Sequence, residues 1–300
     1  MVRLFRPSSA KSFVRRRIDL PLIRSKFLQH RKRLRYFGLP SEGLYDVVDW
    51  SKYIDTVVAV ERGDPYCPER KQSLLLSNAI DLGLIDRLTL LRGEMNRIIM
   101  YERDIYNQRL RYPFELVNFD YGGSILYPDR MRVEALEKFI RNQRGANFLL
   151  LLTLNTREFD SEEINQTQAR ILAEIAQVAP HQAENVERRI KRANASPHPF
   201  MQVVRQVMHV LYMVRGFAEA NRYRVWWELP LVYRGSRKTI LVHYLFDLHH
   251  DPKASTKVVS PQGVMDIVRA SVRILKGQRI RSVALLDSST SDPFIRYLYG

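Results

Sequence analysis

The first half of the chain alternates between short apolar segments and amphipathic segments of helical length. Five apolar segments have the length of buried strands. They cover residues 34–37, 56–61, 88–92, 114–119 and 148–154. Between them, apolar residues recur at helical spacing, which predicts helices over residues 45–53, 69–82, 95–108 and 131–143. Strands separated by helices of this length predict right-handed βαβ units and a parallel sheet covered on both faces.

The second half has a different pattern. Residues 161–195 and 200–220 have helical periodicity, and prolines interrupt this region. Two long strands, 223–233 and 238–249, flank a short turn and predict an antiparallel hairpin, followed by a helix over 263–275 and a strand over 282–286. We therefore predict an α/β, Rossmann-like fold, a mostly parallel sheet closed by an antiparallel C-terminal hairpin, with a helical insertion at about residues 158–221.

Positive charge is concentrated at the N-terminus. The chain has 48 Lys and Arg against 32 Asp and Glu, a net charge of +16, and residues 1–36 alone hold twelve of the cations and one acid. We therefore predict a basic N-terminal arm over residues 1–33 and an α/β domain over residues 34–300. Residues 24–35 predict a basic amphipathic helix that leads into the first strand.

The arm and a second basic stretch in the insertion are candidates for nucleic-acid binding, because clustered cations neutralise phosphates and release counterions. The candidate residues are Arg15, Arg16, Arg17, Arg31, Lys32, Arg33, Arg188, Arg189, Lys191 and Arg192. The alternatives are a solvated face, a surface for an acidic partner protein or, for the first residues, an organellar transit peptide. The helical insertion is also a candidate site for a partner subunit.

Several classes of protein do not fit the sequence. A single cysteine, Cys67, excludes an intrachain disulfide and a thiolate zinc cage, and favours a reducing, cytoplasmic compartment. The longest apolar run, 148–152, is too short to span a bilayer. We expect no metal centre: His243 and His249 are six residues apart on one strand, about 20 Å at about 3.3 Å per residue. Neither a P-loop nor a nucleophile elbow is present.

Ligands of such sheets bind beyond the carboxyl ends of the strands. Five α/β strands followed by an antiparallel hairpin resemble class I S-adenosylmethionine-dependent methyltransferases, over roughly residues 34–160 and 222–250. The resemblance implies S-adenosylmethionine as cofactor, held by the first loop through Gly38, Ser41 and Gly43. It also implies that Glu61, after the second strand, accepts the ribose hydroxyls and that Glu94, after the third, contacts the adenine.

The segment Asp120-Tyr-Gly-Gly-Ser124 follows the fourth strand and is similar to the Asp-Pro-Phe-Gly-Ser variant of the motif that amino-directed methyltransferases use. The resemblance implies that Asp120 and Tyr121 hold a target amino group beside the cofactor. The expected activity is methyl transfer to an amino group of a nucleic acid. The alternative is a catalytically inactive methyltransferase-fold subunit that binds nucleic acid or a partner protein, in a bacterial defence or RNA-processing complex, because the first loop has only two glycines.

Overall fold

The structure, a computed structural model, describes residues 9–63, 67–125, 130–156, 161–195, 199–234, 240–253 and 281–282. The predicted helix over 263–275 and all but the first residue of the predicted strand over 282–286 lie outside these residues. Within them, none of the helices has the length and apolar character that crossing a bilayer requires.

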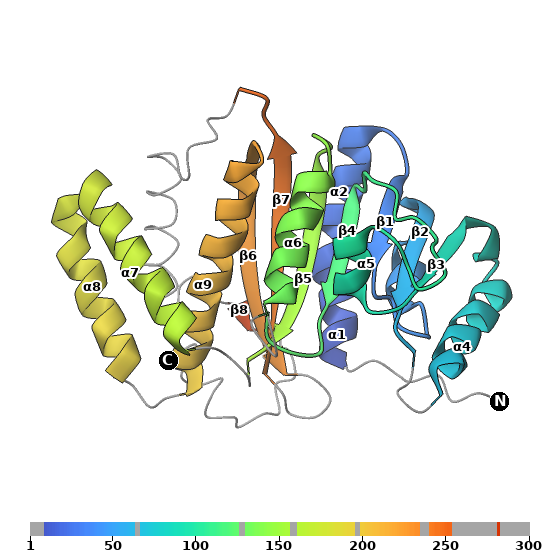
Figure 1. Cartoon of the computed structure of the whole chain (residues 1–300), viewed down its shortest axis with the longest axis horizontal. Helices are drawn as coiled ribbons and strands as arrows, with labels where there is room; N and C mark the ends of the chain where they lie inside the picture. The colour runs from blue at the N-terminus through green and yellow to red at the C-terminus, as the bar shows by residue number, and fades with distance from the viewer. Residues whose placement is uncertain are drawn as a thin grey trace. The chain divides into compact units, whose positions relative to one another are not determined.

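The sheet confirms the predicted fold class. Its strands are hydrogen-bonded in the order β3-β2-β1-β4-β5-β7-β6-β8 (Figure 1). Their bounds are β1 Leu34–Gly38, β2 Ile54–Glu61, β3 Leu88–Arg92, β4 Leu116–Asp120, β5 Phe148–Asn155, β6 Tyr223–Arg234, β7 Ile240–His250 and β8 Arg281–Ser282. β1 is parallel to β2 and to β4, and β2 is parallel to β3. β6 and β7 form the predicted antiparallel hairpin.

The helices follow the predicted periodicity, but those beginning at Leu20, Tyr45 and Met95 end at least three residues earlier than predicted. Their bounds are α1 Ser9–Phe13, α2 Leu20–His30, α3 Tyr45–Trp50, α4 Pro68–Asp81, α5 Met95–Tyr101, α6 Met131–Asn142, α7 Ser161–Val178, α8 Pro180–Ala195 and α9 Pro199–Ala220. The basic helix expected to reach residue 35 ends at His30, because Arg31 takes a left-handed conformation (φ 52°). The helix expected to reach residue 108 ends at Tyr101, where Glu102 does the same (φ 55°).

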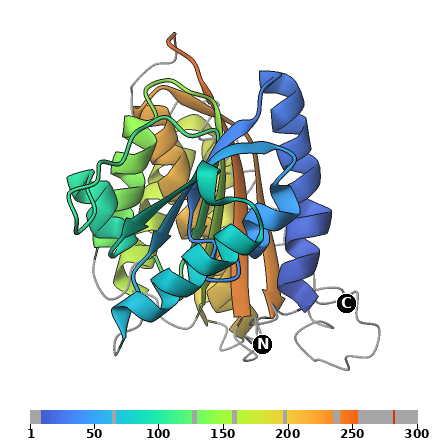
Figure 2. The same ribbon diagram turned by 90° about the vertical axis from the view of Figure 1, so that its right-hand side faces the viewer.

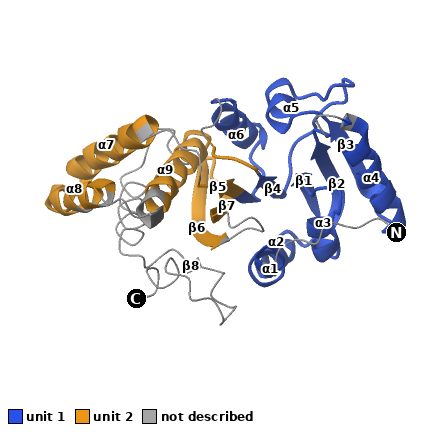
Figure 3. Cartoon of the chain, turned by 90° about the horizontal axis from the view of Figure 1, so that it is seen from below, with its two compact units in different colours: residues 1–120, 129–152 blue, residues 121–128, 153–300 orange. Residues whose placement is uncertain are grey.

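The chain divides into two compact units (Figure 3). Unit 1 holds residues 1–120 and 129–152. In it, α1, α2 and α3 lie on one side of the strands and α5 and α6 on the other (Figures 2 and 3). Aromatic rings pack between α6 and the sheet. Phe37 of β1 stacks on Phe139 of α6, with 5.1 Å between ring centroids, and contacts Phe114 at the same distance. Coverage on both faces is consistent with the burial of β4 and β5 along nearly their whole length.

The described part of the predicted basic arm is an integral part of unit 1. A six-residue π-helical segment, Val14–Asp19, joins α1 to α2. Val14 and Ile23 are buried, and the Trp50 indole N–H donates to the carbonyl of Arg15 at 3.2 Å. Apolar residues of the predicted arm are therefore packed into the core of unit 1, and the domain boundary at residue 33 stays a prediction.

Unit 2 holds residues 121–128 and 153–300. α9 packs against β6 and β7, and α7 and α8 pack against α9 and against each other. Thr167 on α7 and His209 on α9 are joined by a buried hydrogen bond of 2.8 Å between Oγ1 and Nδ1. These three helices are the insertion that the sequence predicts, and Pro180 separates the first from the second.

Candidate functional site

Three of the predicted site residues lie at the carboxyl ends of neighbouring strands in unit 1. Gly38, the last residue of β1, pairs with Ala59 of β2 on one side and with Asn118 of β4 on the other. Glu61 and Asp120 each follow these partners by two residues. β1 is the point where the strand order reverses, and the carboxyl ends beside such a point are where open α/β sheets bind ligands.

The glycines of the first loop are required by neighbouring atoms of the protein itself. A Cβ at Gly38 would lie 2.5 Å from the Asn118 carbonyl oxygen and 2.6 Å from the Tyr36 hydroxyl. At Gly43 a Cβ would lie 2.4 Å from the ring of Tyr45. Ser41, between them, has a φ of 59°. Close packing against backbone at Gly38 and against a side chain at Gly43 therefore accounts for both glycines, whether or not a ligand approaches the loop.

The carboxylates of Glu61 and Glu94 both accept hydrogen bonds from backbone N–H groups. Glu61 Oε1 accepts from the N–H of Gly63 at 2.9 Å, and its side chain is partly exposed. Glu94 is the N-cap of α5 and accepts from the N–H of Arg97 at 3.0 Å. A carboxylate has about four acceptor positions, so a single bond to Gly63 leaves Glu61 able to accept from a diol as well. Glu94 has an evident structural role, because its side chain caps a helix.

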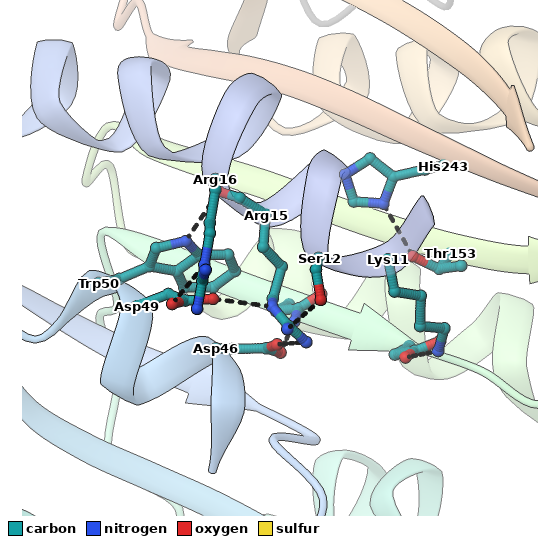
Figure 4. Close-up of polar contacts among 11 residues, drawn as sticks. Lys11, Ser12, Arg15, Arg16, Asp46, Asp49, Trp50, Thr153 and His243 are labelled. Atoms are coloured by element: carbon teal, nitrogen blue, oxygen red, sulfur yellow. Dashed lines mark hydrogen bonds and ion pairs between the residues drawn. The ribbon is translucent and has the colours of Figure 1, made fainter. Parts of the chain in front are cut away.

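Asp120 forms an ion pair with the N-terminal segment. Its Oδ2 lies 2.6 Å from Lys11 Nζ, and about a third of each side chain is exposed. Figure 4 shows the Lys11 side chain extending away from its helix. The charge on the predicted target-binding acid is therefore neutralised within unit 1.

A second set of ion pairs fixes the same segment to α3. Arg15 Nε lies 3.1 Å from Asp49 Oδ2, and Arg15 NH1 lies 3.4 Å from Asp46 Oδ1 (Figure 4). Arg16 Nε contacts the other oxygen of Asp49 at 2.9 Å. The Arg15 side chain is 10% exposed, whereas that of Arg16 is 65% exposed. Arg15 is therefore held against two carboxylates within the fold, and its contact with a phosphate stays a prediction.

Asp46 is the group whose titration this arrangement changes most clearly. Asn118 Nδ2 donates to its Oδ2 at 2.6 Å. Burial raises the pKa of Asp46 from 3.8 to about 7; the positive charge of Arg15 opposes this shift, and the negative charge of Asp120 adds to it. Burial, reinforced by Asp46, also raises the pKa of the Tyr36 phenol well above its usual value. A carboxyl group that takes up a proton near neutral pH thus lies beside the sheet edge that carries Gly38.

Within unit 2, Asn155 holds the turn that follows β4. Its Nδ2 donates to the carbonyl of Gly122 at 2.8 Å, and its backbone N–H donates to the carbonyl of Gly123 at 3.3 Å. Gln206 Nε2 in turn donates to the Asn155 carbonyl at 3.0 Å. Tyr121, a predicted target-binding residue, is buried, with 5% of its surface exposed. At the same end of β5, Thr153 Oγ1 is hydrogen-bonded to His243 Nδ1 at 2.8 Å (Figure 4).

The other basic residues predicted to bind nucleic acid differ in exposure and in whether an acidic side chain is paired with them. Arg17, Arg31 and Arg33 are exposed. Lys32 is exposed but also binds Glu115 at 2.8 Å. In the insertion, Arg188 and Lys191 are paired along α8 with Glu184 and Glu187, and Arg192 is exposed. The side chain of Arg189 lies outside the described residues.

Several polar residues of this region were not predicted from the sequence. They are Lys11, Asp46, Asp49 and Asn118. Two signals could have indicated them. Asn118 interrupts an otherwise apolar strand, and a polar residue inside a buried strand requires a partner. Asp46 lies in the first turn of the helix after the first strand, where the helix dipole favours an acid.

Comparisons with known proteins give only distant similarities. No family model matches the chain, and no curated protein matches it. A putative RNA methyltransferase from Pyrococcus horikoshii is 9% identical, covering 78% of this chain and 82% of its own, with a TM-score of 0.42. An O-methyltransferase from Bacillus cereus, in complex with SAH, is 16% identical, covering 82% and 94%, with a TM-score of 0.38. A Streptococcus agalactiae protein of the NADB-Rossmann superfamily is 12% identical, covering 90% and 76%, with a TM-score of 0.38. Likenesses this distant carry no argument about function.

Proposed function

We propose that the protein is an S-adenosylmethionine-dependent methyltransferase that acts on an amino group of a nucleic acid. One observation carries this proposal: Gly38, Glu61 and Asp120 end three adjacent parallel strands at the point where the strand order reverses. An acid at each flanking strand end offers an acceptor for a sugar diol and an acceptor for an amine. A mostly parallel sheet closed by an antiparallel hairpin is consistent with this assignment.

The residues present fit the cofactor at its ribose. Glu61 would hold the two ribose hydroxyls, since an ionised carboxylate only accepts hydrogen bonds and can bind two donors at once. S-adenosylmethionine, when bound, supplies an electrophilic methyl group. Asp120 would accept a hydrogen bond from the target amine and so direct its lone pair, a contribution of orientation rather than of acid–base strength. In this role Asp120 would use acceptor positions that Lys11, which contacts Oδ2 at 2.6 Å, leaves open.

That ion pair also favours a second candidate function. While Lys11 stays bound to Asp120 Oδ2, it neutralises the carboxylate and occupies one of its oxygens, which makes Asp120 a weaker acceptor for a target amine. The same fold would then serve as a non-catalytic subunit that binds nucleic acid or a partner protein. The two candidates differ in whether they bind the cofactor and transfer its methyl group.

Isothermal titration with S-adenosylmethionine tests the proposed activity. Glu61→Gln keeps an acceptor for the Gly63 N–H but removes the charge, so we expect it to weaken cofactor binding about tenfold. Asp81→Asn, at the exposed end of α4, is the matched control and should bind as the wild type does. Absence of binding by the wild-type chain overturns the methyltransferase proposal and leaves the non-catalytic one. Unchanged binding by Glu61→Gln overturns the role of Glu61 alone.

A further inference from the structure

The loop after α5 is held in one conformation by a buried carboxylate. Asp104 is 9% exposed. Its Oδ1 accepts from the N–H groups of Tyr106 at 2.9 Å and Gln108 at 2.8 Å, and its Oδ2 accepts from the N–H of Arg92 at 3.0 Å. Three backbone donors on one carboxylate organise the loop from within, because each bond fixes a different part of the backbone.

Backbone hydrogen bonds close the same loop and attach it to the sheet. The N–H of Leu110 donates to the carbonyl of Glu102 at 2.9 Å, and Arg103 and Arg109 form an antiparallel bridge. The N–H of Ile105 donates to the carbonyl of Arg92 at 3.1 Å. The loop leaves α5 and returns to the carboxyl end of β3 (Figure 1). Since Arg92 is the register partner of Glu61, the loop is anchored at the edge that carries the candidate cofactor residues.

This ordered segment exposes large apolar side chains. Tyr101 is 73% exposed, Ile105 is 70% exposed and Tyr106 is 61% exposed. The guanidinium of Arg92 lies 5.1 Å from the centre of the Tyr106 ring and supports it. Apolar side chains gathered on a rigid surface segment, rather than scattered, indicate a binding surface.

The charges around these rings are positive. Arg97, Arg103, Arg109 and Arg111 are exposed on the same stretch of chain. Its two acids are directed elsewhere: Asp104 is turned inward to backbone amides, and Glu102 contacts Lys138 Nζ at 3.4 Å. Exposed rings set among arginines match the two parts of a single-stranded nucleic acid, since bases stack on aromatic rings and phosphates pair with cations.

We propose that residues 101–111 form a docking surface for single-stranded nucleic acid. Bases of the strand would stack on the rings of Tyr101 and Tyr106, while the surrounding arginines would bind its phosphates. The inference deepens the proposed function, on which it rests for the class of substrate, and does not depend on cofactor binding. Loop residues would hold the strand beside Glu61 without taking part in methyl transfer.

The test separates the aromatic ring of each tyrosine from its apolar area and its hydroxyl, using fluorescence anisotropy of a labelled single-stranded DNA of about 12 nucleotides. The double variant Tyr101→Leu and Tyr106→Leu keeps apolar area but removes the π face, and we expect binding to weaken between about fivefold and a hundredfold. The double variant Tyr101→Phe and Tyr106→Phe keeps both rings and should bind within about twofold of wild type. Ile80→Ala, a 61% exposed apolar residue of α4, is the matched control and should have no effect.

Three results would overturn this inference. They are equal binding by the Leu and wild-type chains, an equal loss in the Phe variant, and tighter binding of the duplex form of the same oligonucleotide than of the single strand. Each leaves the titration with S-adenosylmethionine unaffected, so failure of the docking surface is distinguishable from failure of the methyltransferase proposal. Matching thermal unfolding of all variants checks that the loop substitutions leave the fold intact.

Discussion

Asp46 makes the stability of unit 1 depend on pH. Its folded pKa, raised by burial to about 7, lies above the value near 4 of an unfolded chain. Between these values the unfolded chain loses its proton while the folded chain keeps it, so stability falls as pH rises from about 4 to about 7 and then levels off. Asp46→Asn cannot ionise and can still accept from Asn118. We therefore expect the free energy of unfolding of this variant, relative to that of the wild type, to rise by on the order of 1–3 kcal/mol as the pH goes from about 4 to about 7.

Urea unfolding at half-unit steps of pH measures this difference. Val48→Ala, on the same helix and 41% exposed, changes no titrating group and serves as control. The free energy of unfolding of Val48→Ala should differ from that of the wild type by the same amount at every pH. A difference between Asp46→Asn and the wild type that does not vary with pH would show that Asp46 titrates alike in the folded and unfolded chains.

At the scale of elements, the N-terminal helical segment is fixed to α3 by two arginines that share one acid. Arg15 is buried between Asp46 and Asp49, and Arg16 reaches Asp49 from solvent. Arg15→Ala leaves Asp46 without its ion-pair partner and Asp49 with Arg16 alone, so we expect a loss of about 2–4 kcal/mol in the free energy of unfolding. Arg16→Ala removes an exposed pair and should cost less than about 1 kcal/mol. Urea denaturation of both variants at pH 8 gives the comparison, and equal losses would contradict it.

The elements were predictable from the sequence where burial alone decides them. β5 is buried along all eight residues, and its apolar run is plain in the sequence. The end of α5 was not predictable, because it depends on Asp104, whose carboxylate accepts from the backbone of β3 and of its own loop. The contacts of Lys11 and Asp120 join residues 109 positions apart, and no periodicity records such a pairing. Candidate residues at strand ends were thus found by position, and their partners only by the fold.

At the scale of the whole molecule, the net charge is +16. Some of the basic side chains behind this charge are buried in the fold, and others are exposed to solvent. Arg15 and Lys26 are buried, whereas Arg17, Arg24, Arg31 and Arg33 are exposed. If the exposed set binds phosphates, each contact contributes about 0.7 to the salt dependence of single-strand affinity. Replacing these four arginines by alanine should therefore lower the slope of log K against log salt concentration by up to about 3.

Anisotropy titrations of a single-stranded oligonucleotide at several salt concentrations measure that slope. The matched control replaces Arg188 and Lys191, which are paired along α8 with Glu184 and Glu187, and should lower it by less than about 1. Because the four-arginine variant keeps Tyr101 and Tyr106, base stacking persists in it, and its affinity at high salt should approach that of the wild type. A slope unchanged by the loss of all four arginines would mean that the N-terminal cations face something other than a polyanion, and the charge of this segment would then serve a protein partner.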